Sequence, residues 1–263
     1  MSAGHSSVQL FHELTRDDLR AAGANALLIL PVAAVEQHGP HLPVGTDWII
    51  VEYVARAAAA AAAQYIPVIV APTLPFGSSD HHLPFSGTMS FSTTAYYRLL
   101  VDIVTSLHTG GFRRMFILNG HGGDHEIIQL VARDMALRHP LRIGAASYWN
   151  IARERLIALD ADHGQRLPGH AGGFESALML ALRPELVRLP LPSRAWTQEN
   201  DPLEPALPFR LEMHGFWQAI DGYSDNPAQA TAERGRVYLD AIVEAVTHAF
   251  LTFDTVTREG FTH

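Results

Sequence analysis

The stretch that decides the fold is LLILPVAAVEQHGPHLPVGTD, residues 27–47. Residues 27–35 are aliphatic and nearly free of polar groups, which is typical of a strand buried on both faces of a parallel sheet. The residues that follow bring carboxylates and histidines together with glycines and prolines, which interrupt regular structure. Since ligands bind at the carboxyl ends of strands in open α/β sheets, this change predicts a functional loop at a strand end.

The loop contains three candidate metal ligands, Glu36, His38 and Asp47. Glu36 and His38 are two residues apart, so in an extended segment their side chains point to the same side. Asp47 follows a turn that prolines and glycines make rigid. Carboxylates and imidazoles are common ligands of divalent metals, so the pattern favours a metal site over a polar surface loop with incidental histidines.

Length and composition exclude several classes of protein. The chain has 263 residues and no internal repeat or evident linker, so we expect one domain over residues 1–263. A net charge of −8 and the lack of a basic cluster argue against a nucleic-acid-binding surface. There are no cysteines, so any metal must be held by nitrogen and oxygen ligands. We find no signal peptide and no long apolar stretch, and therefore expect no membrane association and a cytoplasmic location.

Strand and helix patterns alternate along the chain. After the strand at 27–35 we expect a helix from 47 to about 64, a strand at 67–72, a helix at 92–109, a strand at 115–118, a helix to about 138 and a strand at 141–148. Alternation of this kind predicts a largely parallel sheet with right-handed crossovers. The remaining expectations are a short helix capped by Thr15, an irregular segment at 153–166, a helix at 177–182, a surface segment at 184–208, a strand or hairpin within 209–225 and a final helix over about 228–253.

Polar residues gather in four loops. The first loop offers Glu36, His38 and Asp47; the second Ser78, Asp80, His81 and His82; the third His121, Asp124, His125 and Glu126; the fourth His170 and Glu175. Because parallel strands end along one edge of a sheet, we expect these groups to converge. Carboxylates, a shared aspartate and imidazoles fit a pair of divalent ions about 3.5–4 Å apart, which hold a bridging water, lower its pKa and polarise a carbonyl. The sequence therefore predicts hydrolytic chemistry.

Several of these residues allow two interpretations. Glu175 opens a helix, so its carboxylate is either a metal ligand or a group that stabilises the helix dipole. His170 is a proton shuttle or a substrate contact. His81 lies either behind the ligands or on the loop surface. No nucleophile elbow surrounds Ser78, which favours a substrate contact or a loop hydrogen bond over a nucleophile. The glycine-rich segment 119–123 lacks the spacing and the lysine of a phosphate-binding P-loop.

Four ordered motifs together resemble the creatininase family, also called creatinine amidohydrolases. They are VEQHGPHLP at 35–43 with Asp47, SGTMS at 86–90, NGHGG at 119–123 and HAGGFES at 170–176, and the match covers roughly residues 27–186. The resemblance implies a three-layer α/β/α fold, two divalent metal ions per subunit (zinc, manganese or iron) and hydrolysis of amide C–N bonds. It also implies a closed homo-oligomer, often a hexamer.

Carried over residue by residue, the resemblance places Glu36, Asp47 and His121 on one metal. It places His38 and Asp47, with a further carboxylate, on the second metal, and makes His170 the catalytic histidine. The chain departs from creatininase proper after His121, where a tyrosine and a glutamate are replaced by Gly122 and Gly123. That glutamate is the second metal's carboxylate in creatininase.

Glu175 is therefore our candidate for the second metal and for catalysis, with Asp124 and Glu126 as alternatives. A tryptophan–aspartate pair that packs on creatinine is also replaced, by Arg166 and Leu167. We expect the substrate to contact Ser78, His81, Gly122 and Arg166, and creatinine itself to be a poor substrate.

These observations predict a metal-dependent amidohydrolase that acts on a small cyclic amide, a formamide or a short peptide. One alternative is a two-metal phosphoesterase, which would need a basic phosphate pocket that the sequence does not show. Another is a binding or assembly protein that keeps a metal for stability. A structural metal site is closed and needs only about four ligands, whereas this chain offers more, and His170 is surplus to such a site.

Overall fold

The computed structural model describes residues 8–161, 167–194 and 211–258. Among these residues five parallel strands form one sheet in the order β1-β3-β2-β4-β5. The strands are β1 (Gln9–Leu10), β2 (Leu27–Val32), β3 (Val68–Val70), β4 (Arg114–Asn119) and β5 (Arg142–Ser147). The parallel sheet predicted from the alternation of patterns is confirmed.

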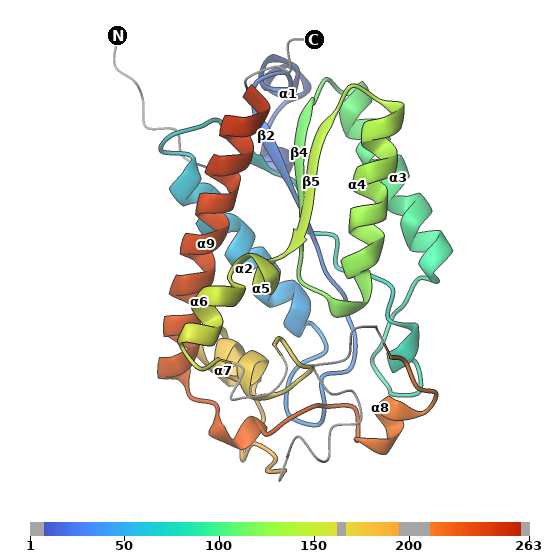
Figure 1. Ribbon diagram of the computed structural model, residues 1–263, viewed down its shortest axis with the longest axis vertical. Coiled ribbons are helices and arrows are strands. Elements are labelled where there is room, and N and C mark those ends of the chain that lie inside the picture. Colours follow the sequence, from blue (N-terminus) through green and yellow to red (C-terminus); the bar gives the residue numbers. More distant parts are fainter. Residues whose placement is uncertain (1–7, 162–166, 195–210, 259–263) are drawn as a thin grey trace.

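The sheet lies between two layers of helices (Figure 1). Strand β2 is buried along its whole length, and its alternate side chains enter two separate hydrophobic clusters. Leu27 and Ile29 pack on the face covered by α2 (Thr46–Ala62), α7 (Gly173–Leu182) and α9 (Ala232–Arg258). Leu28 and Leu30 pack on the face covered by α3 (Thr93–Thr109) and α4 (His125–Arg138). An apolar strand without alternation is therefore what a three-layer α/β/α fold requires.

The alanine run in α2 allows a second helix to lie close to it. Ala55, Ala58 and Ala62 are fully buried in the same cluster as Ile242 and Val246 of α9. Alanine combines high helix propensity with a small side chain, so the run both forms the helix and brings α9 near. Figure 1 shows α9 crossing the face of the sheet beside α2.

The predicted element boundaries are confirmed to within a few residues for α2, α3, β4, α4 and β5. Thr15 caps α1 (Arg16–Ala22) in a reciprocal capping box with Asp18. The first strand is shorter than predicted, because the chain leaves the sheet after Val32, and Val35 instead forms an isolated bridge with Met89. Strand β1 was not predicted from the sequence; among the described residues it pairs with β3 alone, at the edge of the sheet.

Two expectations for the second half are wrong. Residues 211–225 contain no strand or hairpin but the short helix α8 (Phe216–Ala219); positions 209 and 210 lie outside the described residues. Gly215 and Gly222 adopt positive φ angles of 76° and 71° and turn the chain on both sides of this helix. The segment at 153–166 is more regular than expected, since it contains α6 (Arg153–Ala158) directly after α5 (Tyr148–Ile151), while 162–166 lie outside the described residues.

Helix α7 begins at Gly173, earlier than expected, and the Gly173 N–H donates to Asp225 Oδ1 at 2.7 Å. Helices α7 and α8 lie beyond the carboxyl ends of the strands, at the lower end of Figure 1. None of the helices in the described ranges is long and apolar enough to cross a membrane.

Candidate metal centre

Three of the predicted ligands meet where β2, α2 and β4 come together. His38 follows β2, Asp47 lies in the first turn of α2, and His121 follows β4 directly. All three are at least 97% buried. Asp47 lies between the two imidazoles: its Oδ1 is 3.0 Å from His38 Nε2, and its Oδ2 is 3.0 Å from His121 Nδ1. Each carboxylate oxygen therefore faces a different histidine.

Backbone carbonyls orient both histidines. His38 Nδ1 lies 3.1 Å from the Glu36 carbonyl oxygen, and His121 Nε2 lies 3.1 Å from the Ser78 carbonyl oxygen. A carbonyl only accepts, so each of these nitrogens carries a hydrogen and the other nitrogen of each ring faces Asp47. This is how a metal-binding histidine is usually held, with one nitrogen tied to the protein and the other directed at the ion.

The charge balance also favours a cation at this place. Burial alone would lower the pKa of His38, but Asp47 and the neighbouring glutamates raise its pKa to about 10. Burial likewise opposes the charged form of His121, yet Glu36 and other carboxylates hold its pKa well above the usual value. Buried carboxylates thus attract protons onto both imidazoles, and divalent ions would balance the same negative charge.

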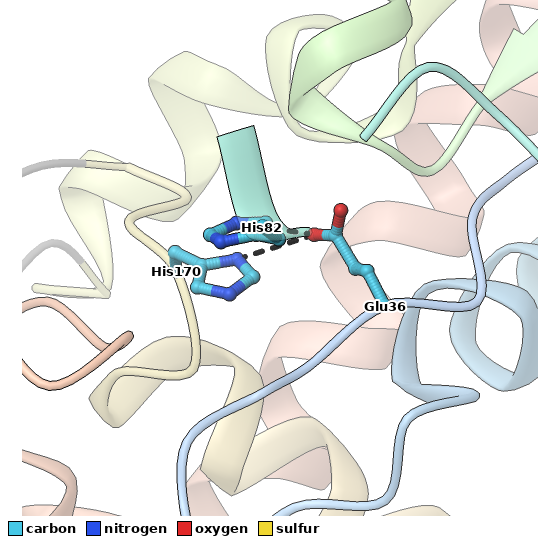
Figure 2. Close-up of side chains that lie close together, drawn as sticks. All are labelled: Glu36, His82 and His170. Atoms are coloured by element: carbon cyan, nitrogen blue, oxygen red, sulfur yellow. Dashed lines mark ion pairs between the residues drawn. The ribbon is translucent and has the colours of Figure 1, made fainter. Parts of the chain in front are cut away.

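Glu36 is the centre of a second group of imidazoles. Its Oε1 is 3.4 Å from His121 Nδ1, 3.5 Å from His170 Nδ1 and 3.6 Å from His82 Nε2. Figure 2 shows the rings of His82 and His170 side by side, both directed at this oxygen. Burial would raise the pKa of Glu36, but His121 and the other facing imidazoles hold it well below its usual range. Glu36 Oε2 is buried without a hydrogen-bond partner, as expected for an oxygen that binds a cation.

The fourth loop brings His170 and Glu175 to the same place. The Ala171 N–H donates to Glu175 Oε2 at 2.6 Å, which directs this carboxylate back toward the loop, 3.8 Å from His38 Nε2. Burial raises the pKa of Glu175 to about 8. Donor atoms of His38, His170 and Glu175 lie within 4.8 Å of one another.

The two alternative carboxylates lie elsewhere. Asp124 Oδ1 accepts from the Ser78 N–H at 2.8 Å, and Glu126 is exposed on α4. Neither belongs to a group of potential metal ligands among the described residues. Of the three carboxylates considered for the second metal, Glu175 is thus the one placed beside His38.

The residues expected to contact the substrate differ in how exposed they are and in what they touch. Ser78 is buried beside His121, and its carbonyl rather than its hydroxyl contacts the ring. His81 is half-buried and stacks on His121 with ring centroids 6.0 Å apart. Gly122 is exposed, and a Cβ there would meet no atom within 4 Å. Arg166 lies outside the described residues.

Gly123 leaves no room for a side chain. A Cβ at this position would lie 2.4 Å from the Ser78 carbonyl oxygen and 2.5 Å from His121 Nε2. These contacts are closer than real Cβ atoms allow, so the loop in this conformation cannot supply a ligand from position 123. The carboxylate for the second metal must come from another segment.

Two residues to which the sequence assigned no separate role cover the cluster. His82 is 1% exposed and stacks on His170 with centroids 4.1 Å apart, whereas the preceding histidine is half-exposed. Trp217 of α8 lies 4.7 Å from the His82 ring, 5.1 Å from the His170 ring and 5.8 Å from the His81 ring. His82 was one of several polar loop residues without a distinguishing signal, and Trp217 belongs to no motif.

Together, the parallel sheet and the buried carboxylates and imidazoles at its carboxyl edge define an α/β protein with a cluster of potential metal ligands. The profile of one family, described as creatininase (creatinine amidohydrolase), matches residues 12–250. The chain belongs to the creatininase family.

Relatives of this chain carry the names of different hydrolases. The mycofactocin precursor peptide peptidase of Mycobacterium tuberculosis is 31% identical over 230 residues, which cover 82% of this chain and 81% of the relative. The creatinine amidohydrolase of Pseudomonas putida is 26% identical over 261 residues, which cover 88% of this chain and 91% of the relative. Membership of the family therefore does not make this chain a creatininase proper.

Solved structures agree with this relationship. A crystal structure of creatinine amidohydrolase superposes with a TM-score of 0.75 at 25% identity, covering 94% of this chain and 98% of that one. Two further creatininase structures, with TM-scores of 0.72 and 0.71 at 26% and 25% identity, are described as a Zn-Zn type and as creatininase Mn; each covers 94% of this chain and 98% of its own. The α/β/α fold implied by the sequence motifs is confirmed.

Proposed function

We propose that this family member is a binuclear amidohydrolase, which uses two divalent metal ions to cleave the C–N bond of a small amide. The observation that carries the proposal is the position of Asp47, whose two oxygens face the free nitrogens of two different histidines at 3.0 Å each. A carboxylate held in this way is suited to bridge two ions.

The residues present fit two ions. Glu36, Asp47 and His121 would hold one, and His38, Asp47 and Glu175 would hold the other. Zinc, manganese and iron suit such a set of nitrogen and oxygen ligands, and relatives described as Zn-Zn and Mn forms support the first two. When bound, the ions supply polarisation of the amide carbonyl and a lowered pKa for water.

His170 has the properties of the group that moves the proton. Burial, together with His82 and His38, holds its pKa well below the usual value, so the ring is neutral and one of its nitrogens carries a lone pair. Its Nδ1 faces Glu36 at 3.5 Å, within the cluster of potential ligands. His170 would take a proton from the attacking water and return it to the nitrogen of the leaving amine.

The substrate we propose is larger than creatinine, and is a cyclic amide, a formamide or a short peptide. Gly122 adds no side chain beside the cluster, and a Cβ there would meet open space. Trp217 and His81 would form the aromatic side of the substrate site, because both are half-buried and lie next to the buried histidines. The relative named as a peptide peptidase supports a short peptide among these classes.

We also propose that the chain assembles into a homo-oligomer, such as a hexamer. Trp48 and Tyr53 of α2 are 41% and 42% exposed, and Met89 is 51% exposed. Exposed large apolar side chains mark a surface that a partner covers where they form one contiguous patch.

An amide panel tests the proposed activity. Chelator-treated protein is assayed with and without restored Zn²⁺ or Mn²⁺ on creatinine, formanilide and leucine 4-nitroanilide, with detection of creatine, formate and amine. We expect turnover of at least one non-creatinine amide that disappears on chelation and returns with metal. Turnover that chelation does not change would contradict the proposal, as would the absence of turnover on every amide of the panel.

A further inference from the structure

The side chain of Gln37 is held in one orientation by two backbone groups. Its Oε1 accepts from the Gly39 N–H at 2.9 Å, and its Nε2 donates to the Gly222 carbonyl at 2.7 Å. Rotating the amide by half a turn would place oxygen against the carbonyl and N–H against N–H. Because neither backbone group can change its role, the orientation is determined by the contacts themselves.

Gln37 also touches two of the histidines that face Glu36. Its Nε2 lies 2.9 Å from His82 Nδ1 and 3.0 Å from His170 Nε2. The amide has two hydrogens, of which the Gly222 carbonyl takes one. Only one hydrogen therefore remains for the two imidazoles.

The backbone of Gln37 decides which imidazole receives that hydrogen. His170 Nε2 is 2.9 Å from the Gln37 carbonyl oxygen, which can only accept, so this nitrogen carries a hydrogen of its own. The second amide hydrogen then goes to His82 Nδ1, which must be bare. In the neutral rings His170 is left with a bare Nδ1, and His82 with a hydrogen on Nε2.

Those remaining nitrogens are the two that meet at Glu36 Oε1, at 3.5 Å from His170 and 3.6 Å from His82 (Figure 2). The two rings are stacked with centroids 4.1 Å apart, yet they present opposite groups to the same oxygen. His82 offers an N–H that stabilises the carboxylate. His170 offers a lone pair.

We propose that Gln37 is a positioning residue that sets the tautomer with the hydrogen on Nε2 in both His82 and His170, so that His82 presents its N–H to Glu36 and His170 presents its lone pair. The inference rests on the proposed function and deepens it, because a proton shuttle is effective only if its bare nitrogen faces the reacting groups. It also implies that His82 is not a metal ligand through Nε2, because this nitrogen carries a hydrogen. Its distance from Glu36 alone would allow the two residues to share an ion.

The test compares two substitutions with a matched control. Gln37→Met keeps the length of the side chain but removes the amide, and Gln37→Glu keeps the acceptor for Gly39 while removing both donors. Gln129→Met removes another glutamine that lies 2.9 Å from a histidine ring, His125 Nε2, on the exposed side of α4. We expect both Gln37 variants to keep the metal content of the wild type and to lose about 10–100-fold in kcat with little change in KM, as is common for residues that orient site histidines. Gln129→Met should keep full activity.

Nitrogen NMR of the zinc-loaded protein reads the tautomers directly and needs no substrate. With ¹⁵N-labelled histidine, and with resonances assigned through His82→Asn and His170→Asn, the wild type should show His170 protonated at Nε2 and His82 protonated at Nε2. In Gln37→Glu the His82 hydrogen should move to Nδ1, where the new carboxylate accepts it. If Gln37→Met fails to fold, Gln37→Glu still provides this result.

Each outcome separates the inference from the activity on which it rests. An unchanged His82 tautomer in Gln37→Glu would overturn the inference even if the protein hydrolyses amides, whereas His170 should keep its hydrogen on Nε2 because the Gln37 backbone carbonyl remains. A loss of kcat that matches a loss of bound metal would overturn it as well. If the wild type hydrolyses no amide on the panel, the proposed function fails, while the NMR comparison still decides whether Gln37 sets the tautomers.

Discussion

The buried ion pair between Arg114 and Asp254 provides a quantitative test of how α9 is fixed to the sheet. Arg114 begins β4, and its Nη1 donates to Asp254 Oδ1 at 2.5 Å, with both side chains 5% exposed. A second nitrogen of the guanidinium donates to the Asn25 carbonyl. Arg258 Nε contacts the other Asp254 oxygen at 2.5 Å, but its side chain is 46% exposed.

Substitutions of Asp254 and of Arg258 should therefore lower the free energy of unfolding by very different amounts. Asp254→Asn leaves a buried guanidinium without its counter-charge, which costs about 3–5 kcal/mol. Arg258→Ala removes a half-exposed partner that contributes about 1 kcal/mol or less. A chain of this size loses about 2–4 °C in Tm per kcal/mol, so we expect a decrease of about 6–20 °C for Asp254→Asn and less than about 4 °C for Arg258→Ala.

The assays are thermal unfolding for Tm and urea unfolding for the free energy of unfolding, both on the metal-loaded variants and followed by circular dichroism. Metal content should stay unchanged, because Arg114 lies at the opposite end of β4 from His121. Equal losses of stability for the two variants would refute the reasoning, as would an Asp254→Asn protein within about 1 kcal/mol of the wild type.

Three further predictions concern the site and its surroundings. Glu175→Gln should weaken binding at one metal position while the other persists, which metal titration followed by calorimetry would show; unchanged affinity at both would return Glu175 to a role in starting α7. His170→Ala should keep its metal and lose about 10²–10⁴ in kcat; loss of metal together with activity would make His170 a ligand. Burial raises the pKa of Asp225 from 3.8 to about 7, so the folded chain binds this proton more tightly than the unfolded chain. Its contribution to stability is full below pH 3.8 and is lost as the pH rises toward 7, and Asp225→Asn should remove a slope of at most about 1.4 kcal/mol per pH unit. Parallel pH profiles of unfolding for the two proteins would contradict that prediction.

Those parts of the fold that depend on local physics could be predicted from the sequence. An aliphatic run predicts β2, because a strand buried on both faces has apolar side chains on both. The glycines, prolines and charged residues that follow the run predict the loop after it. Thr15 and Ser92 cap helices through side-chain contacts three residues away, which are visible in sequence. The positions of Glu36, His38 and Asp47 follow from these local features together.

The parts that depend on distant contacts could not be predicted. Trp217 reaches the imidazoles because Gly215 and Gly222 turn the chain around α8, and no pattern in the sequence connects that segment to the loop at 78–82. Strand β1 has two residues and exists only through its pairing with β3. His81 and His82 are neighbours of the same type, and only the turn that contains them determines which one is buried.

The assignment of Glu175 shows an intermediate case. The replacement of a glutamate by Gly123 indicates that another carboxylate is needed, but three were available in the sequence. The structure separates them through hydrogen bonds: the Ala171 N–H directs Glu175 toward His38, and the Ser78 N–H holds Asp124. The sequence thus predicts that a further carboxylate is needed, and the hydrogen bonds of the folded chain favour Glu175.

The central claim, that Asp47 is shared by two metal ions, is tested most directly by counting metal in an Asp47 variant. Wild type, Asp47→Ala and the control Asp240→Ala, which removes an exposed aspartate of α9, are loaded with Zn²⁺, dialysed and analysed by plasma mass spectrometry. Circular dichroism confirms that each is folded. We expect two ions per chain in the wild type and in Asp240→Ala, and the loss of both ions together in Asp47→Ala. One ion retained at wild-type affinity in Asp47→Ala, or a single ion in the wild type, would contradict the claim.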